Sequence, residues 1–118
     1  MQEAMAEIII YQIDISKKPS QSLVFLPYDT LIRSHGLPDM ANYAEVYRAK
    51  VRHTSDQALL DSIFTLLNAE NRPAGDSMRS LSVSDVVVID GRAYYCDFVG
   101  WKRIDWPAGR ADAAGSQA

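Results

Sequence analysis

Two β-rich segments flank the dipeptide Asp90-Gly91, and no other feature of this 118-residue chain constrains its fold as strongly. Asp-Gly supplies the two positive φ angles that a type I′ turn requires. Residues 86–89 and 92–98 are therefore predicted to form a β-hairpin. A two-residue loop sets its register and places Val87 opposite Tyr94. The C-terminal half is thus predicted to be antiparallel sheet.

The rest of the chain predicts two more strands and two helices. Apolar, β-branched residues on both alternating faces predict a central strand over residues 7–15. Alternating polarity predicts another strand over residues 43–51. Residues 27–35 predict a short helix, because proline favours the first helical position and a glycine follows the last. Apolar residues at helical spacing predict a longer helix over residues 55–68, with Thr54 as its N-cap.

Together these elements predict a single α+β domain over residues 1–106. Its mainly antiparallel four-stranded sheet carries both helices on one face, in the order strand-helix-strand-helix-strand-strand. Residues 23–26 are expected to be extended, because a proline follows them. A loop is expected over residues 68–77. Residues 107–118 contain nothing to pack and are expected to form a disordered tail.

Charge and cysteine content limit the partners and the compartment. The chain has 12 basic and 15 acidic residues, a net charge of −3 and a pI near 5.2. Nucleic-acid binding is therefore unlikely, because it depends on clustered Lys and Arg. The single cysteine excludes an intrachain disulfide and fits a cytoplasmic location. The N-terminus does not resemble a signal peptide, and the apolar run Val86–Ile89 is too short to span a membrane.

A polar cluster lies where the hairpin begins. The expected register places Ser84 opposite Asp97, with Ser82 and Asp85 beside them. One interpretation is a hydrolase in which the fold brings a histidine to Ser84 and Asp97. The other is that these side chains satisfy backbone groups where a loop becomes a strand. We favour the second, because hydroxyl-to-backbone bonding is the commoner use of such residues.

The remaining reactive side chains form no recognisable catalytic or metal-binding motif. A carboxylate beside Cys96 would raise the pKa of its thiol and weaken it as a nucleophile. His35 and His53 are isolated, and one cysteine with two histidines gives no zinc spacing. The chain lacks a glycine-rich phosphate loop and a nucleophile elbow. We expect no cofactor, no metal and no catalytic residue.

The segment after the hairpin is the expected contact surface for a partner protein. Trp101 and Trp106 flank a cationic pair, Lys102 and Arg103. Tryptophan and arginine are enriched among the residues that dominate binding energy at interfaces. Trp101 could also close an edge of the core, whereas Trp106 adjoins the expected tail and is more readily a surface residue.

Several segments taken together resemble the YodL-like domain family over about residues 8–104. The most specific are residues 80–87, SLSVSDVV, and residues 94–101, YYCDFVGW. Residues 10–12, 25–28, 42–47 and 63–68 add weaker support. Such domains are common in Gram-positive gut bacteria, often on conjugative and other mobile elements, and no general activity or cofactor is attached to the family. The resemblance implies an accessory or protein-interaction module whose partner is open; a nucleic-acid-associated module and an unrecognised hydrolase are the alternatives.

Overall fold

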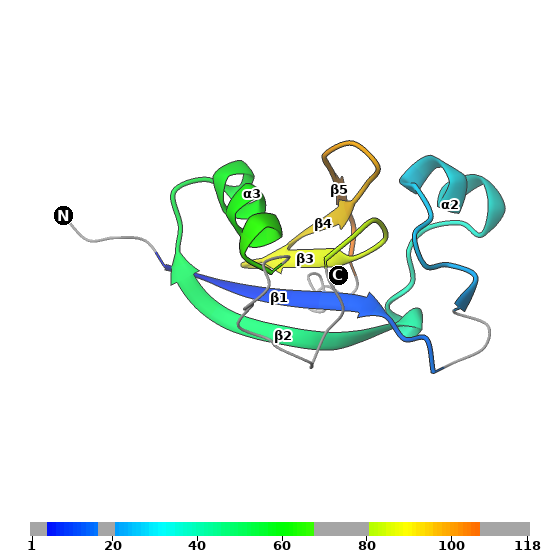
Figure 1. The fold of residues 1–118 in the computed structure, drawn as a ribbon, viewed down its shortest axis with the longest axis horizontal. Coiled ribbons are helices and arrows are strands. Elements are labelled where there is room, and N and C mark those ends of the chain that lie inside the picture. Colours follow the sequence, from blue (N-terminus) through cyan, green and yellow to red (C-terminus); the bar gives the residue numbers. More distant parts are fainter. Residues whose placement is uncertain (1–4, 17–20, 68–80, 107–118) are drawn as a thin grey trace, which may run out of the picture.

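The computed structural model describes residues 5–16, 21–67 and 81–106. In these parts of the chain, two α-helices and a short 3₁₀ helix accompany five strands (Figure 1). The elements are β1 (Met5–Ile13), α2 (Tyr28–Ser34), η1 (Met40–Asn42), β2 (Tyr43–Arg52), α3 (Asp56–Leu67), β3 (Val86–Ile89), β4 (Arg92–Cys96) and β5 (Trp101–Ile104). The predicted loop over residues 68–77 and the predicted tail over residues 107–118 lie outside the described residues.

All five strands form one antiparallel sheet in the order β2-β1-β3-β4-β5. The α+β class is confirmed, and so is the central position of β1. The prediction of four strands is wrong, because β5 adds a fifth at one edge and extends the element order. The sequence did not predict β5 because the strand is only four residues long and contains two charged residues, Lys102 and Arg103.

The predicted hairpin and the register around its turn are confirmed, although the second strand ends at Cys96 and not at residue 98. Val87 pairs with Tyr94 and Ile89 with Arg92 across the turn. Asp90 and Gly91 have φ angles of 47° and 86°, the positive values that the type I′ turn requires. The amide of Asp90 also donates to the carbonyl of Glu7, which joins the turn to the neighbouring strand β1.

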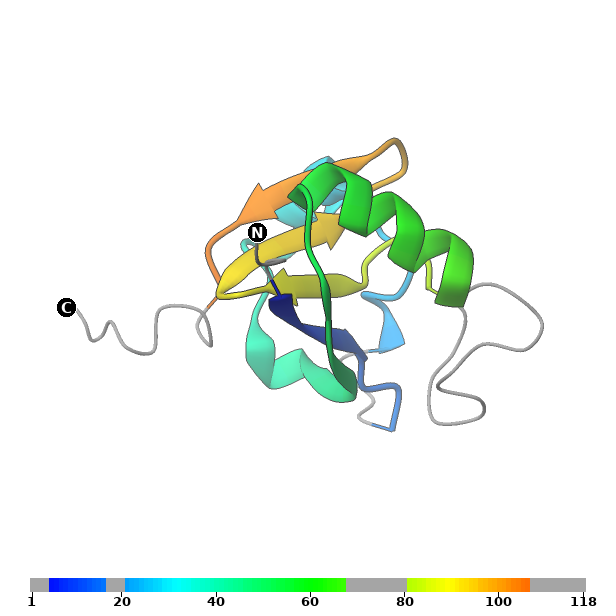
Figure 2. The ribbon, with the colours of Figure 1, turned by 90° about the vertical axis from the view of Figure 1, so that its left-hand side faces the viewer.

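Two apolar clusters cover opposite faces of the sheet. Alternate residues of a strand face opposite sides, so Val87 joins one cluster with α3 and Val88 joins the other with α2. Figure 1 shows the two helices over opposite ends of the sheet, and the view in Figure 2 places α3 nearest the reader. The expectation that both helices share one face is therefore wrong. Because each face buries its own cluster, the interior strand β3 is apolar and buried on both sides.

The longer helix begins one residue later than predicted. Ser55 is the N-cap of α3: its Oγ accepts a hydrogen bond from the amide of Ala58 at 3.1 Å. Thr54 is therefore not the cap, although both residues have the required hydroxyl. The predicted stop of α2 is correct, since Gly36 has a φ of 93° and its amide donates to Leu31.

Residues 23–26 form a turn and not the predicted extended segment. The amide of Leu26 donates to the carbonyl of Leu23 at 3.4 Å. Phe25 has a φ of 68°, which is uncommon for a residue with a side chain. Tertiary contact explains the conformation, because the Phe25 amide donates to the Ser84 side chain.

Candidate functional site

The polar cluster before β3 is built around a tight turn at Ser84. The Asp85 amide donates to the Ser82 carbonyl at 3.1 Å, and Ser84 has a φ of 89°, as the third residue of a type II turn does. The Ser84 amide then donates to Cys96 oxygen, and the Cys96 amide donates to Asp85 oxygen. Ser84 and Asp85 thus both lie opposite Cys96, and this arrangement of two residues against one is a β-bulge. The predicted pairing of Ser84 with Asp97 is wrong because of this bulge.

Ser84 is 1% exposed and bonds through both its side chain and its backbone. Its Oγ accepts from the Phe25 amide at 3.1 Å, and its carbonyl accepts from the Tyr43 hydroxyl at 2.7 Å. Burial raises the pKa of Tyr43, which keeps this donor protonated. The hydroxyl of Ser84 is therefore committed to holding the preceding loop against the sheet.

Asp85 is a buried carboxylate with neutral donors around it. Its Oδ2 accepts from the Ser82 amide at 2.8 Å and from the Gln12 amide side chain at 2.9 Å. Gln12 belongs to β1, so this carboxylate joins the turn to the strand beside β3. The burial and main-chain bonding expected for Ser84 and Asp85 are both present. Their purely structural role stays a prediction.

Asp97 connects β4 to α2 and shapes the loop that follows. One oxygen of its carboxylate accepts from the Tyr28 amide at 2.9 Å and from the Phe98 amide at 2.8 Å. Pro27, the N-cap of α2, offers no side-chain bond, so Asp97 supplies from another element the acceptor that the helix lacks.

The residues considered for hydrolysis do not come together. Burial, and then the Asp85 and Asp97 charges, raise the pKa of the Cys96 thiol to about 12. Within the described residues, His53 bonds to Asp56 and His35 to Ser34, and neither histidine forms a hydrogen bond with Ser84 or Cys96. The histidine–nucleophile contact that acyl transfer requires is not formed by these side chains.

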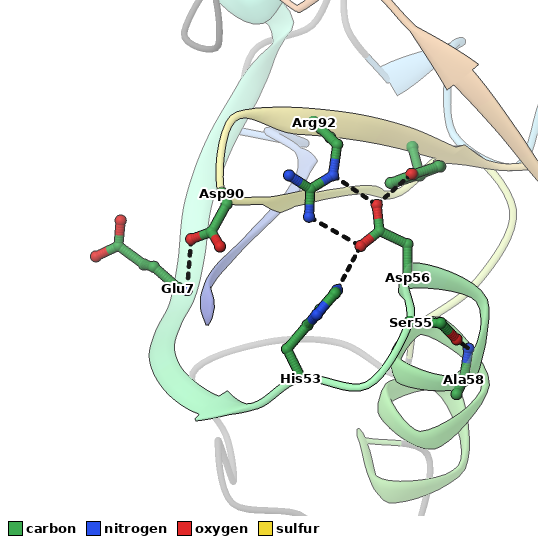
Figure 3. A network of polar contacts seen from close by, with 8 residues as sticks. Glu7, His53, Ser55, Asp56, Ala58, Asp90 and Arg92 are labelled. Atoms are coloured by element: carbon green, nitrogen blue, oxygen red, sulfur yellow. Dashed lines mark hydrogen bonds and ion pairs between the residues drawn. The ribbon is translucent and has the colours of Figure 1, made fainter. Parts of the chain in front are cut away.

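A second polar network joins α3 to the hairpin, and sequence reasoning missed it (Figure 3). Asp56 accepts from Arg92 Nε at 2.7 Å, from Arg92 Nη2 at 2.9 Å, and from the Tyr94 hydroxyl. His53 Nε2 lies 2.6 Å from the same carboxylate. These bonds, led by those from Arg92, hold the pKa of Asp56 well below its usual range. The hairpin register places Arg92 and Tyr94 on the same face of the sheet, but it does not predict that Asp56 of α3 contacts them.

The four residues of the predicted contact surface differ in their exposure to solvent. Lys102 and Arg103 are exposed, and Trp101 is half-buried. Trp106 is 2% exposed and lies among core side chains, with ring centroids 5.3 Å from Tyr11 and 5.0 Å from Tyr43. The prediction that Trp106 belongs to the surface is therefore wrong, because the sheet residues provide an aromatic pocket that the sequence did not reveal.

Trp101 instead lines a groove of about 410 Å³ between α3 and the loop that joins β4 to β5. Phe64 of α3 and Phe98 of the loop share this groove with Trp101. Phe98 and Val99 form the loop tip and are 79% and 84% exposed. The remaining lining residues are Gln57, Asp61, Thr65, Cys96, Asp97 and Gly100. We define the interaction groove as these lining residues together with Val99.

The YodL-like domain family model matches residues 7–106, which include every described strand and helix except the first residues of β1. The chain belongs to this family. Neither the search of the curated proteins nor that of the solved structures found a match.

This YodL-like domain has a second, smaller pocket of about 270 Å³ beside α2 and η1. Leu31 and Tyr95 line it together with the polar residues His35 and Asp39. The Tyr95 hydroxyl is already bonded to the Leu26 carbonyl, and burial raises its pKa. Tyr95 therefore has a structural contact of its own within this pocket.

Two further properties of this YodL-like domain bear on its chemistry. The described residues contain no group of three or more His, Cys, Asp or Glu side chains that could hold a metal ion. No helix in the same parts of the chain is long and apolar enough to cross a membrane. The interaction groove could not be predicted from the sequence, because its residues come from α3 and β5, which are far apart along the chain.

Proposed function

We propose that this YodL-like domain is a protein-interaction module without enzymatic activity, and that it binds its partner through the interaction groove. One observation carries the proposal: Phe98 and Val99 project into solvent at the tip of a short loop. Loop tips are normally built from Gly, Asn, Asp, Ser and Pro, which satisfy backbone geometry. Two large apolar side chains at this position add little to the stability of the isolated fold, and their exposure to water is unfavourable.

Neighbouring side chains turn this tip into a patch. An apolar residue exposed alone is ordinary on a protein surface. Here Phe64 is 41% exposed and, with Trp101, faces the groove that Phe98 borders. Contiguous exposed apolar side chains with a polar rim mark interaction sites.

The loop is held in place before any partner arrives. Asp97 bonds to the Phe98 amide at the base of the tip and to the first turn of α2. The Asp97 amide also donates to the Gly100 carbonyl at 3.0 Å, closing the loop. A pre-ordered loop loses less conformational entropy on binding, which favours affinity.

The enzyme alternative receives less support from the same residues. Ser84 is buried and bonded to main chain, and the raised pKa of Cys96 disfavours a thiolate. The acidic net charge gives no support to the nucleic-acid alternative. We extend the proposal to the setting that the family resemblance implies: a cytoplasmic accessory protein encoded on a mobile element.

Site-specific photo-crosslinking tests the proposal. A photoreactive phenylalanine analogue replaces Phe98, and in a matched control it replaces Arg33, an exposed residue of α2 outside the groove. In cells of the host species, we expect a defined protein adduct from position 98 that position 33 does not give. Equal adducts from both positions, or an adduct with nucleic acid, would contradict the proposal.

A further inference from the structure

We infer that the partner segment bound by the interaction groove is basic as well as apolar: a stretch in which Arg or Lys adjoins aliphatic or aromatic side chains. The inference rests on the proposed function and adds the chemical class of the partner. It depends on the charges and rings that line the groove, which are separate from the exposed loop tip that carries the proposed function.

Two carboxylates line the groove, and their charge is not neutralised within the described residues. Asp61 accepts a hydrogen bond from the neutral Gln57 side chain at 3.1 Å. From the described part of the chain, Asp97 accepts two hydrogen bonds, both from backbone amides, those of Tyr28 and Phe98. Lys, Arg and His do not occur among the described lining residues. Among the described lining residues, a cation from a partner would therefore meet two negative charges and no positive charge.

Aromatic rings in the same groove provide a second attraction for a cation. Phe64, Phe98 and Trp101 line it, and the face of an aromatic ring attracts ammonium and guanidinium groups. Arginine gains further because its planar group also stacks on such rings. Rings flanked by carboxylates suit a side chain with a long apolar stem and a cationic end.

The chain's own nearby cations lie over other rings. Lys102 Nζ lies 5.5 Å from the centre of the Tyr28 ring, and Arg103 lies 5.7 Å from that of Tyr94. Neither Tyr28 nor Tyr94 lines the groove. Lys102 and Arg103 of β5 therefore do not provide the cation for which the groove is suited. The net charge of −3 would also steer a basic segment toward this protein and repel a second copy of it.

Selection from a randomised peptide-display library, against the full chain, tests the inference. We expect enriched peptides to combine Arg or Lys with aliphatic or aromatic residues. Replacing Arg by citrulline in such a peptide keeps the shape but removes the charge, and should weaken binding about fivefold or more. The indole N–H resonance of Trp101 reports binding at the groove, and that of the buried Trp106 serves as an internal reference.

Matched variants assign the charge effect to the groove. Asp61→Asn should weaken binding of a selected basic peptide about threefold, the effect of losing one partly exposed ion pair. Asp105→Asn removes an exposed carboxylate that does not line the groove and should leave the affinity unchanged. The dependence on Asp61 should shrink as salt is raised, because exposed charges are screened.

The outcomes separate this inference from the proposed function. If Phe98→Ser abolishes peptide binding while citrulline peptides bind as well as arginine peptides, the groove binds apolar segments and the inference is wrong. Enrichment of acidic peptides also overturns it. If no peptide that depends on Phe98 is selected, the proposed function fails with it.

Discussion

Two short connections that meet at the Cys96 end of β4, the turn before β3 and the loop after β4, differ in a way that reverses the usual rule of burial. The turn before β3 is polar, yet Ser84 and Asp85 are each 1% exposed. The loop after β4 ends in Phe98 and Val99, which are apolar and exposed. Both connections adjoin Cys96, so the same strand end meets them.

The comparison separates residues that stabilise the fold from residues that are exposed for binding a partner. The buried polar side chains of Ser84 and Asp85 bond to main chain and to Gln12, so their burial is compensated. The exposed apolar side chains of the loop tip have no comparable role in the core. We therefore expect changes in the turn to reduce stability, and changes at the tip to reduce binding.

The largest effect is expected for Asp85→Ala. The substitution leaves the buried Gln12 side chain and the Ser82 amide without this acceptor. Buried donors that lose their partner should cost about 2–3 kcal/mol in the free energy of unfolding. Urea denaturation measures the loss, and Asp105→Ala is the control, with an expected change below about 0.5 kcal/mol. Equal, small changes for both variants would remove the distinction between the two regions.

Asp56→Asn should have the next largest effect, and it depends on pH. Bonds from Arg92, Tyr94 and His53 hold the pKa of Asp56 below its unfolded value of about 4, so ionised Asp56 stabilises the folded protein above that pH. The variant should lose about 1–2 kcal/mol at neutral pH, less than for a buried network because Arg92 is partly exposed.

The same linkage fixes the direction of the acid response. As pH falls from about 5 toward 2, Asp56 gains a proton in the unfolded state first, and the stabilisation is lost. The difference between wild type and Asp56→Asn should therefore shrink in acid, as measured by denaturant unfolding at several pH values. A difference that grows in acid would contradict the assignment of Asp56 as the ionised partner.

A smaller effect is expected at the start of α3. Ser55→Ala removes the hydroxyl that accepts from the Ala58 amide, and should cost about 1 kcal/mol. Thr54→Ala, one residue away, should cost much less, since Thr54 is not the cap. A larger loss from Thr54→Ala, in thermal or urea unfolding, would return the cap to the position that the sequence predicted.

Local signals in the sequence predicted most of the fold. The Asp90-Gly91 turn determined the hairpin register. Apolar, β-branched residues on both faces located β1, and alternating polarity located β2, because these patterns depend on neighbouring residues. The fifth strand was missed because its four residues carry two charges. The helices were placed on one face because apolar spacing identifies the buried side of a helix but not which face of a sheet covers it.

The candidate site was less predictable, because it depends on contacts between distant segments. Trp106 was expected at the surface until Tyr11 and Tyr43 proved to surround it. Asp56 and Arg92 are 36 residues apart, and nothing in the sequence pairs them. Trp101 was identified for its side-chain type, but Phe64 joins it only through the fold.

The most direct test of the account measures stability and binding on the same preparation of the double variant Phe98→Ser, Val99→Ser. We predict a free energy of unfolding within about 0.5 kcal/mol of wild type, because these side chains are exposed, together with loss of capture of the crosslinked partner. Marked destabilisation would show that the tip supports the fold. Unimpaired capture by a stable variant would show that the loop tip is not where the partner binds.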